Sequence, residues 1–355
     1  MARAALAEGS LLVSKRDRCA QRAQVLAENV QKQGHPDTIV TNNYPQDFRR
    51  SGLQFDVVLA DVPCSGEGMF RKDPAAIGEW SLQNVEKCWR LQREIVADAW
   101  CCLRPGGLFV YSTCTFNTKE DEENVAYMCE ELGAEVLAVD TDGRWGIMGS
   151  VLPGFDKSVY RFLPGRTQGE GLFMAVMRKT GDAPASDGRV NGRKAGKERR
   201  QGGGSAVADA CKKWLRQPDG FEIVVDGNTV TAISRPWKPF YDAARKSLNV
   251  LSAGVPLGEV KGKDVIPSQA LALSICLDAS AFPSVELDYG QALCYLRKEA
   301  VPLPSDTPRG HVLMAYKGVP LGFEKNIGNR ANNLYPAEWK IKSSHTPEGD
   351  NEVLS

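Results

Sequence analysis

The first half of the chain alternates short apolar segments with segments of helical spacing, and this alternation most constrains the fold. Strands are expected at 10–14, 38–43, 55–61, 108–113, 134–139 and 171–179, and helices at 22–34, 82–103 and 119–133. The run 55–61 is apolar on both faces, which is typical of a buried parallel strand. Alternating strands and helices predict an α/β domain built on a doubly wound parallel sheet.

Polar residues follow several of the expected strands at the point where each strand ends. Asn43, Asp61 and Cys114 all occupy such positions. In open α/β sheets, ligands bind outside the carboxyl ends of the strands. We therefore expect a site at this edge of the sheet.

Two cysteines follow neighbouring expected strands. Asp61 and Cys64 stand in the stretch DVPCSGEGMFRKDP, and Cys114 follows the strand LFVYST. The ends of adjacent strands lie about 5 Å apart, so the two thiols could share one cleft. The three histidines, His35, His311 and His345, are distant from both cysteines in sequence, which disfavours a cysteine–histidine protease or acyltransferase.

A thiol and an acid without a histidine suit methylation at carbon 5 of a pyrimidine. A thiolate that adds to carbon 6 makes carbon 5 nucleophilic, and an acid near ring nitrogen 3 stabilises the adduct by proton transfer. The base must leave its stack to be reached. The spacing alone also allows two ordinary core cysteines, because free cysteine is among the most buried residue types.

The composition excludes several other classes of protein. The ten cysteines are scattered without a C-x-x-C pair, so neither a disulfide scaffold nor a structural zinc site is expected, and no metal is assigned. No apolar run approaches the roughly 20 residues of a membrane helix, and the start lacks the features of a signal peptide. We expect reduced thiols and a cytoplasmic protein that is monomeric. Because the formal net charge is zero, binding of nucleic acid would depend on local basic patches.

The composition changes after the first domain. Residues 181–207 are rich in Gly, Ser, Ala, Lys and Arg, which predicts a flexible basic linker. A smaller α+β region follows at 208–342, with short strands and the basic, polar stretch KNIGNRANNLYPAEW, and 343–355 is expected to be a disordered tail. The acids of KEDEE, from Lys119 to Glu123, are expected to complement a helix dipole and not to bind metal.

Four motifs in order resemble the Nol/Nop/Sun family of RNA cytosine-C5 methyltransferases, and its RsmF-like branch in particular, which acts on bacterial ribosomal RNA. They are DVPCSGEGMFRKDP, LRPGGLFVYSTCTFNTKEDEENV, LGEVKGKDVIPSQALALS and GVPLGFEKNIGNRANNLYP. The resemblance implies a Rossmann-like class I methyltransferase sheet over 1–180 and a PUA-like, RNA-binding C-terminal domain. It also implies S-adenosylmethionine as cofactor and RNA, most of all 16S rRNA, as partner.

The resemblance also implies roles for individual residues. Cys114 would be the nucleophile, and Cys64 would help to release the product. Asp61 would contact the cofactor and the cytosine ring, and Asn43 would lie near the adenosine. Arg71 and Lys72 would face RNA phosphates, although a solvated surface pair is the alternative.

The chain departs from the family's pattern at the cofactor site. The family's first strand and its glycine-rich cofactor loop are absent from this sequence, as is the glutamate that follows the second strand, where Lys15, Arg16 and Asp17 stand instead. We therefore expect an N-terminally truncated methyltransferase with weak or no activity. The alternatives are a remnant that only binds RNA and a methyltransferase that acts on transfer RNA.

Overall fold

The computed structural model describes residues 3–7, 10–14, 20–181, 204–262, 264–343 and 345. Most of the predicted linker and of the predicted tail lie outside these residues, as do Lys15, Arg16 and Asp17. The chain divides into two compact units, the first comprising 1–26, 38–195 and 239–252 and the second comprising 27–37, 196–238 and 253–355. Residues 239–252 thus group with the first unit, although the sequence suggested a linear division.

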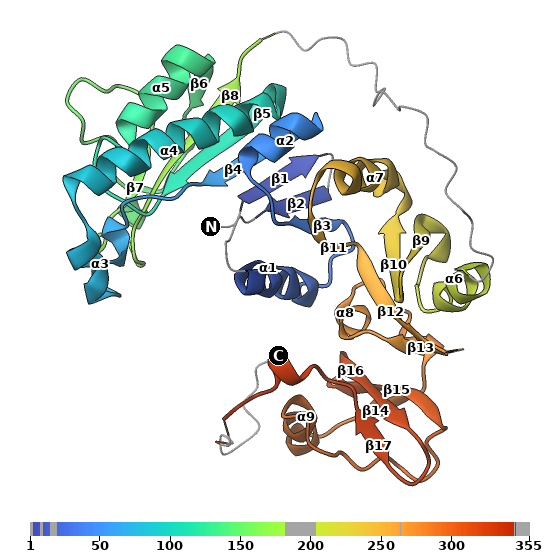
Figure 1. Cartoon of the computed structure of the whole chain (residues 1–355). Coiled ribbons are helices and arrows are strands. Elements are labelled where there is room, and N and C mark those ends of the chain that lie inside the picture. Colours follow the sequence, from blue (N-terminus) through green and yellow to red (C-terminus); the bar gives the residue numbers. More distant parts are fainter. Residues whose placement is uncertain are drawn as a thin grey trace. The chain divides into compact units, whose positions relative to one another are not determined.

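The first unit is built on a nine-stranded sheet with the order β11-β3-β2-β1-β4-β5-β8-β6, in which β7 pairs with β8 (Figure 1). The strands are β1 Arg3–Ala7, β2 Ser10–Ser14, β3 Thr38–Thr41, β4 Phe55–Asp61, β5 Leu103–Thr113, β6 Ala134–Leu137, β7 Tyr160–Phe162, β8 Leu172–Lys179 and β11 Val250–Ala253. The pairs β2–β3 and β4–β5 are parallel, as the sequence predicts. The sheet is mixed and not purely parallel, because β8 runs antiparallel to β5, β6 and β7, and β1 runs antiparallel to β2 and β4.

Strand β1 occupies the middle of this sheet, where no strand was expected from the sequence pattern. Arg3 pairs with Ser14 of β2 and with Ala60 of β4, and both pairings are antiparallel. The inner edges of β2 and β4, which a missing strand would expose, are therefore paired, as buried backbone groups must be. The amino end of β1 lies at the carboxyl ends of β2 and β4.

The first unit also contains several helices. They are α1 Ala20–Lys32, which continues into the second unit, α2 Pro45–Ser51, α3 Pro74–Glu79, α4 Leu82–Cys101, α5 Glu122–Leu132 and α7 Lys238–Ser247, with short 3-10 turns at Glu67–Met69 and Gly143–Trp145. Helix α4 packs on β4 and β5 and lies between α2 and α5 (Figure 1). The predicted stop at Gly133 is confirmed, since this residue ends α5 with φ 68°. The helix predicted over 82–103 ends at Cys101, and Pro105–Gly107 belong to β5 at an irregularity in its pairing with β4.

The second unit contains two four-stranded sheets with the orders β13-β12-β10-β9 and β14-β15-β16-β17. The strands are β9 Phe221–Asp226, β10 Thr229–Ser234, β12 Val255–Lys261, β13 Asp264–Pro267, β14 Ser284–Glu286, β15 Gly310–Tyr316, β16 Val319–Asn326 and β17 Ala331–Asn333. The helices are α6 Gly204–Lys212, α8 Gln269–Leu273 and α9 Tyr289–Leu296, with 3-10 turns at Pro218–Gly220, Arg235–Trp237, Ala279–Ala281 and Ala337–Trp339. Leu257 of the first sheet and Phe323 of the second belong to one apolar core, so this α+β module packs as a single body.

A buried carboxylate without a partner lies in this unit. Glu324 of β16 is 1% exposed, and neither of its carboxylate oxygens has a hydrogen-bond partner among the described residues. Burial raises its pKa to about 7. Because the pKa is higher in the folded than in the unfolded chain, the folded state binds the extra proton, and its stability falls as the pH rises from about 4.5 to about 7.

We predict that Glu324→Gln makes the chain more resistant to urea at pH 8, by about 2–3 kcal/mol, and changes little at pH 4.5. Glutamine keeps the shape and cannot ionise, so the loss of stability across this pH range should shrink. Urea unfolding at both pH values measures the effect. Glu259→Gln, at an exposed position of β12, serves as the matched control. An undiminished pH dependence in Glu324→Gln would contradict the account.

Candidate active site

The two cysteines singled out by the sequence lie side by side. Cys64 follows β4 by three residues, Cys114 directly follows β5, and their sulfurs are 2.9 Å apart. Both thiols are free and half-buried. Since β4 and β5 are neighbouring parallel strands, the pair lies at the carboxyl edge of the sheet, where the sequence predicted a site.

Backbone contacts hold the two cysteine loops together. The amide of Val62 donates to the carbonyl of Ser112 at 3.0 Å, and the amide of Gly68 donates to the carbonyl of Cys114 at 2.9 Å. A Cβ atom at Gly68 would lie 2.7 Å from that same carbonyl oxygen. Only glycine fits this close approach, which explains one glycine of the SGEG turn.

The two thiols differ in acidity because they interact. A hydrogen bond from the Cys64 thiol lowers the pKa of Cys114, against the opposing effects of burial and of the nearby Asp61 carboxylate. The same contact, followed by burial, raises the pKa of Cys64 well above its usual range. The directions of these shifts favour Cys114 as the more acidic thiol of the pair. Asp61 ends β4 close enough to act on Cys114 through its charge.

Glu120 is buried and holds the Cys64 loop in place through hydrogen bonds. Its carboxylate accepts hydrogen bonds from the amide of Ser65 at 3.0 Å and from the side chains of Gln92 at 2.7 Å and Asn117 at 2.9 Å. Gln92 also donates to the carbonyl of Pro63 at 2.8 Å. The backbone on both sides of Cys64 is thereby held to the segment that follows Cys114.

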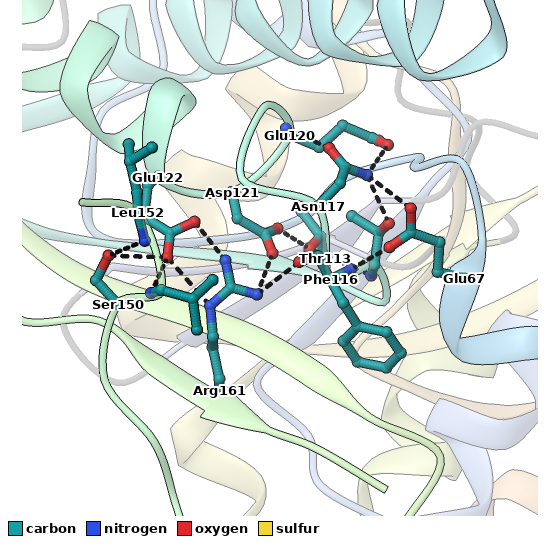
Figure 2. Close-up of polar contacts among 12 residues, drawn as sticks. Glu67, Thr113, Phe116, Asn117, Glu120, Asp121, Glu122, Ser150, Leu152 and Arg161 are labelled. Carbon is teal, nitrogen blue, oxygen red and sulfur yellow. Dashed lines mark hydrogen bonds and ion pairs between the residues drawn. The ribbon is translucent and has the colours of Figure 1, made fainter. Parts of the chain in front are cut away.

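Glu67 makes a second connection between the two loops. It accepts hydrogen bonds from the amide of Phe116 at 2.7 Å and from the side chains of Asn117 and Trp80, each at 3.1 Å. Figure 2 shows Asn117 between Glu67 and Glu120. One asparagine thus joins the carboxylates that hold the two loops.

Arg161 neutralises the next two acids. It is 1% exposed and forms ion pairs with the buried carboxylates of Asp121, at 3.1 Å, and Glu122 (Figure 2). Arg161 also donates to the carbonyl of Phe116 at 2.9 Å. Burial raises the pKa of Asp121, and the arginine opposes that shift. Loss of one partner from such a buried pair typically costs about 3–5 kcal/mol.

These contacts correct one expectation from the sequence. The acids of KEDEE were interpreted as complements of a helix dipole, and Glu122 and Glu123 do lie in the first turn of α5, but Glu120, Asp121 and Glu122 are also fully buried and hydrogen-bonded. The sequence feature that could have indicated their burial is their position within eight residues of Cys114, which follows a strand. Arg161 was missed altogether, because a charged residue between Tyr160 and Phe162 in a strand is ordinarily expected to face solvent.

The remaining predicted residues lie around the thiol pair or apart from it. Asn43 follows β3, and its side chain donates to Asp47 at 3.2 Å and accepts from the amide of Asn249 at 2.9 Å. Arg71 is exposed and contacts the carbonyl of Gly169 at 3.2 Å and the Glu170 carboxylate at 3.4 Å, and Lys72 is exposed. Only Cys64, Cys114 and Asp61 are brought together by the contacts described above.

Comparison with protein families agrees with this geometry. The family described as 16S rRNA methyltransferase RsmB/F matches residues 4–178, and the methyltransferase RsmF PUA domain matches residues 282–341. Residues 4–178 belong to the RsmB/F family of rRNA methyltransferases. The first unit carries the Rossmann-like sheet of such enzymes, and the chain's C-terminal region is PUA-like.

Curated relatives carry the name ribosomal RNA small subunit methyltransferase F. The chain is 29% identical to that of Erwinia tasmaniensis over 90% of this chain and 66% of the relative, and 28% identical to that of Cronobacter sakazakii over 94% and 69%. The chain therefore spans about two thirds of the length of these relatives.

Solved structures give a partial match. NSun6 from Pyrococcus horikoshii with SFG is 27% identical, with a TM-score of 0.41, over 49% of this chain and 42% of that one. A methyltransferase homologue from the same organism is 23% identical, with a TM-score of 0.34, over 40% and 45%. No helix in the part of the chain that the structure describes is long and apolar enough to cross a membrane.

We predict that Cys64→Ala raises the pKa of Cys114, because alanine removes the thiol that donates to the Cys114 thiolate. The rate of alkylation of Cys114 by iodoacetamide, followed by mass spectrometry as a function of pH, should shift to higher pH. Cys88→Ala removes a half-buried thiol elsewhere, on α4, and should leave the profile unchanged. An unchanged profile in Cys64→Ala would show that Cys64 does not support the thiolate.

Proposed function

We propose that the chain is an S-adenosylmethionine-dependent RNA cytosine-C5 methyltransferase that acts on 16S rRNA through a covalent cysteine adduct. The contact between the Cys64 and Cys114 sulfurs, 2.9 Å apart at the carboxyl edge of the sheet, carries this proposal. It supplies a thiolate and a proton donor without a histidine. Membership of residues 4–178 in the RsmB/F family supports the same reaction.

The first step follows from the acidity of Cys114. Its thiolate forms a bond to carbon 6 of the cytosine, the ring electrons move towards nitrogen 3, and that nitrogen receives a proton from solvent through Asp61. Carbon 5 then has enamine character and can form a new bond. S-adenosylmethionine, when bound, supplies the methyl group that carbon 5 accepts.

Product release assigns a role to Cys64. Once Cys114 is bonded to carbon it carries no charge, so the thiolate that raised the pKa of Cys64 is gone. Cys64 can then release its thiol proton to solvent and accept the proton from carbon 5. The electrons of that C–H bond restore the ring double bond, the carbon–sulfur bond breaks to return Cys114 as a thiolate, and nitrogen 3 gives its proton back to solvent through Asp61.

The residues proposed for the cofactor fit it in part. Asp61 is half-buried at the carboxyl end of β4, where ligands bind in such sheets. Asn43 follows β3 at the same edge, but its amide group already bonds Asp47 and Asn249. We propose Asp61 as the main contact and Asn43 as a neighbour of the adenosine. Arg71 and Lys72 remain proposed contacts of RNA phosphates, and a monomer in the cytoplasm remains our prediction.

The orientation of β1 favours a second candidate, a chain that binds RNA without methylating it. Because β1 is antiparallel to β2 and β4, its amino end lies at the carboxyl edge of the sheet, so no loop follows β1 there to enclose a cofactor. Such a chain would keep RNA contacts through the PUA-like region. A methyltransferase that acts on transfer RNA would use the same thiol chemistry.

Covalent trapping on a 16S rRNA transcript tests the proposal. With S-adenosylmethionine present, Cys64→Ala should accumulate a protein–RNA adduct that survives denaturing electrophoresis, because release is slowed. Cys114→Ala should form none, since it lacks the attacking sulfur. Cys88→Ala should behave as wild type. Adduct formation by Cys114→Ala would reverse the assigned roles, and RNA binding with no adduct in any variant would favour the second candidate.

A further inference from the structure

A cavity in the PUA-like region stands apart from the thiol site. It has a volume of about 430 Å³ and lies between the loop 301–309 and the end of the β16–β17 hairpin, 326–331. A volume of this size falls within the usual range for sites that bind small molecules or single nucleotides. The thiol chemistry proposed above uses none of its residues.

The charge of this cavity is positive. Arg309 and Arg330 line it, and no aspartate or glutamate does. Both arginines are exposed, and neither forms an ion pair with a carboxylate among the described residues. An arginine without an internal partner is available to a phosphate, which its guanidinium can bind with two parallel hydrogen bonds.

Local contacts give the cavity a defined shape. The side chain of Asn326 donates to the carbonyls of Thr307 at 2.9 Å and Pro308 at 3.1 Å, and it accepts from the amide of Gly328 at 2.8 Å. A Cβ atom at Gly328 would lie 2.6 Å from a guanidinium nitrogen of Arg309, so this side chain rests directly on the glycine backbone. The two sides of the cavity are thus joined, and Arg309 is held at its wall.

Another part of the cavity wall is apolar. Pro302, Leu303 and Pro304 present apolar side chains to it. A cavity with two cationic groups and an apolar wall suits a ligand that has both a phosphate and a planar base. A free phosphate would use only the arginines.

We propose that this cavity binds a nucleotide of single-stranded RNA, with its phosphates on Arg309 and Arg330 and its base against the proline-rich wall. The inference rests on the proposed RNA substrate and names where the PUA-like region would hold it. Two phosphate contacts in single-stranded RNA correspond to a contribution of about −1.4 to the slope of log K against log salt.

Fluorescence anisotropy with a labelled single-stranded RNA fragment of 16S rRNA, with the full chain and no cofactor, tests this site. Arg309→Gln/Arg330→Gln should weaken binding at least tenfold at low salt and reduce the salt slope by about 1 to 1.5. Arg309→Lys/Arg330→Lys keeps both charges and should retain most of the salt slope while losing affinity, because lysine cannot form the two parallel bonds. The matched control is Lys213→Gln/Lys261→Gln, which removes two exposed charges of the same unit away from the cavity.

The outcomes separate this inference from the proposed reaction. Equal binding by wild type and Arg309→Gln/Arg330→Gln would overturn the nucleotide site, while an adduct in the trapping experiment would leave the methyltransferase intact. An equal loss in the lysine control would show general charge attraction and also overturn the site. No binding of the fragment by wild type would overturn the nucleotide site, and the trapping experiment would still decide the reaction separately.

Discussion

Three consecutive buried carboxylates, Glu120, Asp121 and Glu122, hold the loops of the first unit in place. Glu120 binds the backbone beside Cys64, and the other two bind Arg161, which reaches the carbonyl next to the Cys114 loop. Isolated buried charges are strongly unfavourable, so each of these groups must keep its partners. The position of both cysteines therefore depends on this network of buried groups.

This dependence keeps two free thiols in contact. Their sulfurs are 2.9 Å apart, whereas a disulfide bond is about 2.05 Å long. The loops that carry them are fixed by carboxylates and by the close approach of Gly68 to the Cys114 carbonyl. The contact makes the two acidities unequal, and in the proposed reaction that inequality sets the order, with Cys114 ionising first and Cys64 after Cys114 is bonded.

Much of this organisation could be predicted from the sequence. The strands that end at Asp61 and Thr113 followed from their apolar runs, and their parallel order followed from the intervening helix α4. Juxtaposition of Cys64 and Cys114 followed from the spacing of adjacent strand ends. The antiparallel strand β1 could not be predicted, because its alanine-rich sequence lacks the alternation of apolar and polar residues that marks a strand. It is a strand because it pairs with the open edges of β2 and β4.

The polar network around Arg161 could not be predicted from local sequence patterns either. Arg161 is 39 residues from Glu122, and nothing in the intervening sequence indicates that β7 returns to α5. Glu324 was equally hidden, because a single acid in a strand is usually expected to face solvent. The chemistry of these residues is decided by their burial in the folded chain. That burial cannot be read from the spacing of residues in the sequence.

Tritium exchange at carbon 5 tests the central claim most directly, since attack of Cys114 on carbon 6 is the step that labilises that position. A 16S rRNA transcript with [5-³H]cytidine, incubated with the chain, should release tritium into water with wild type and not with Cys114→Ala. Cys64→Ala should still release it, more slowly. Release by Cys114→Ala at the wild-type rate would contradict the account, because the sulfur assigned as nucleophile would then not be needed for the adduct.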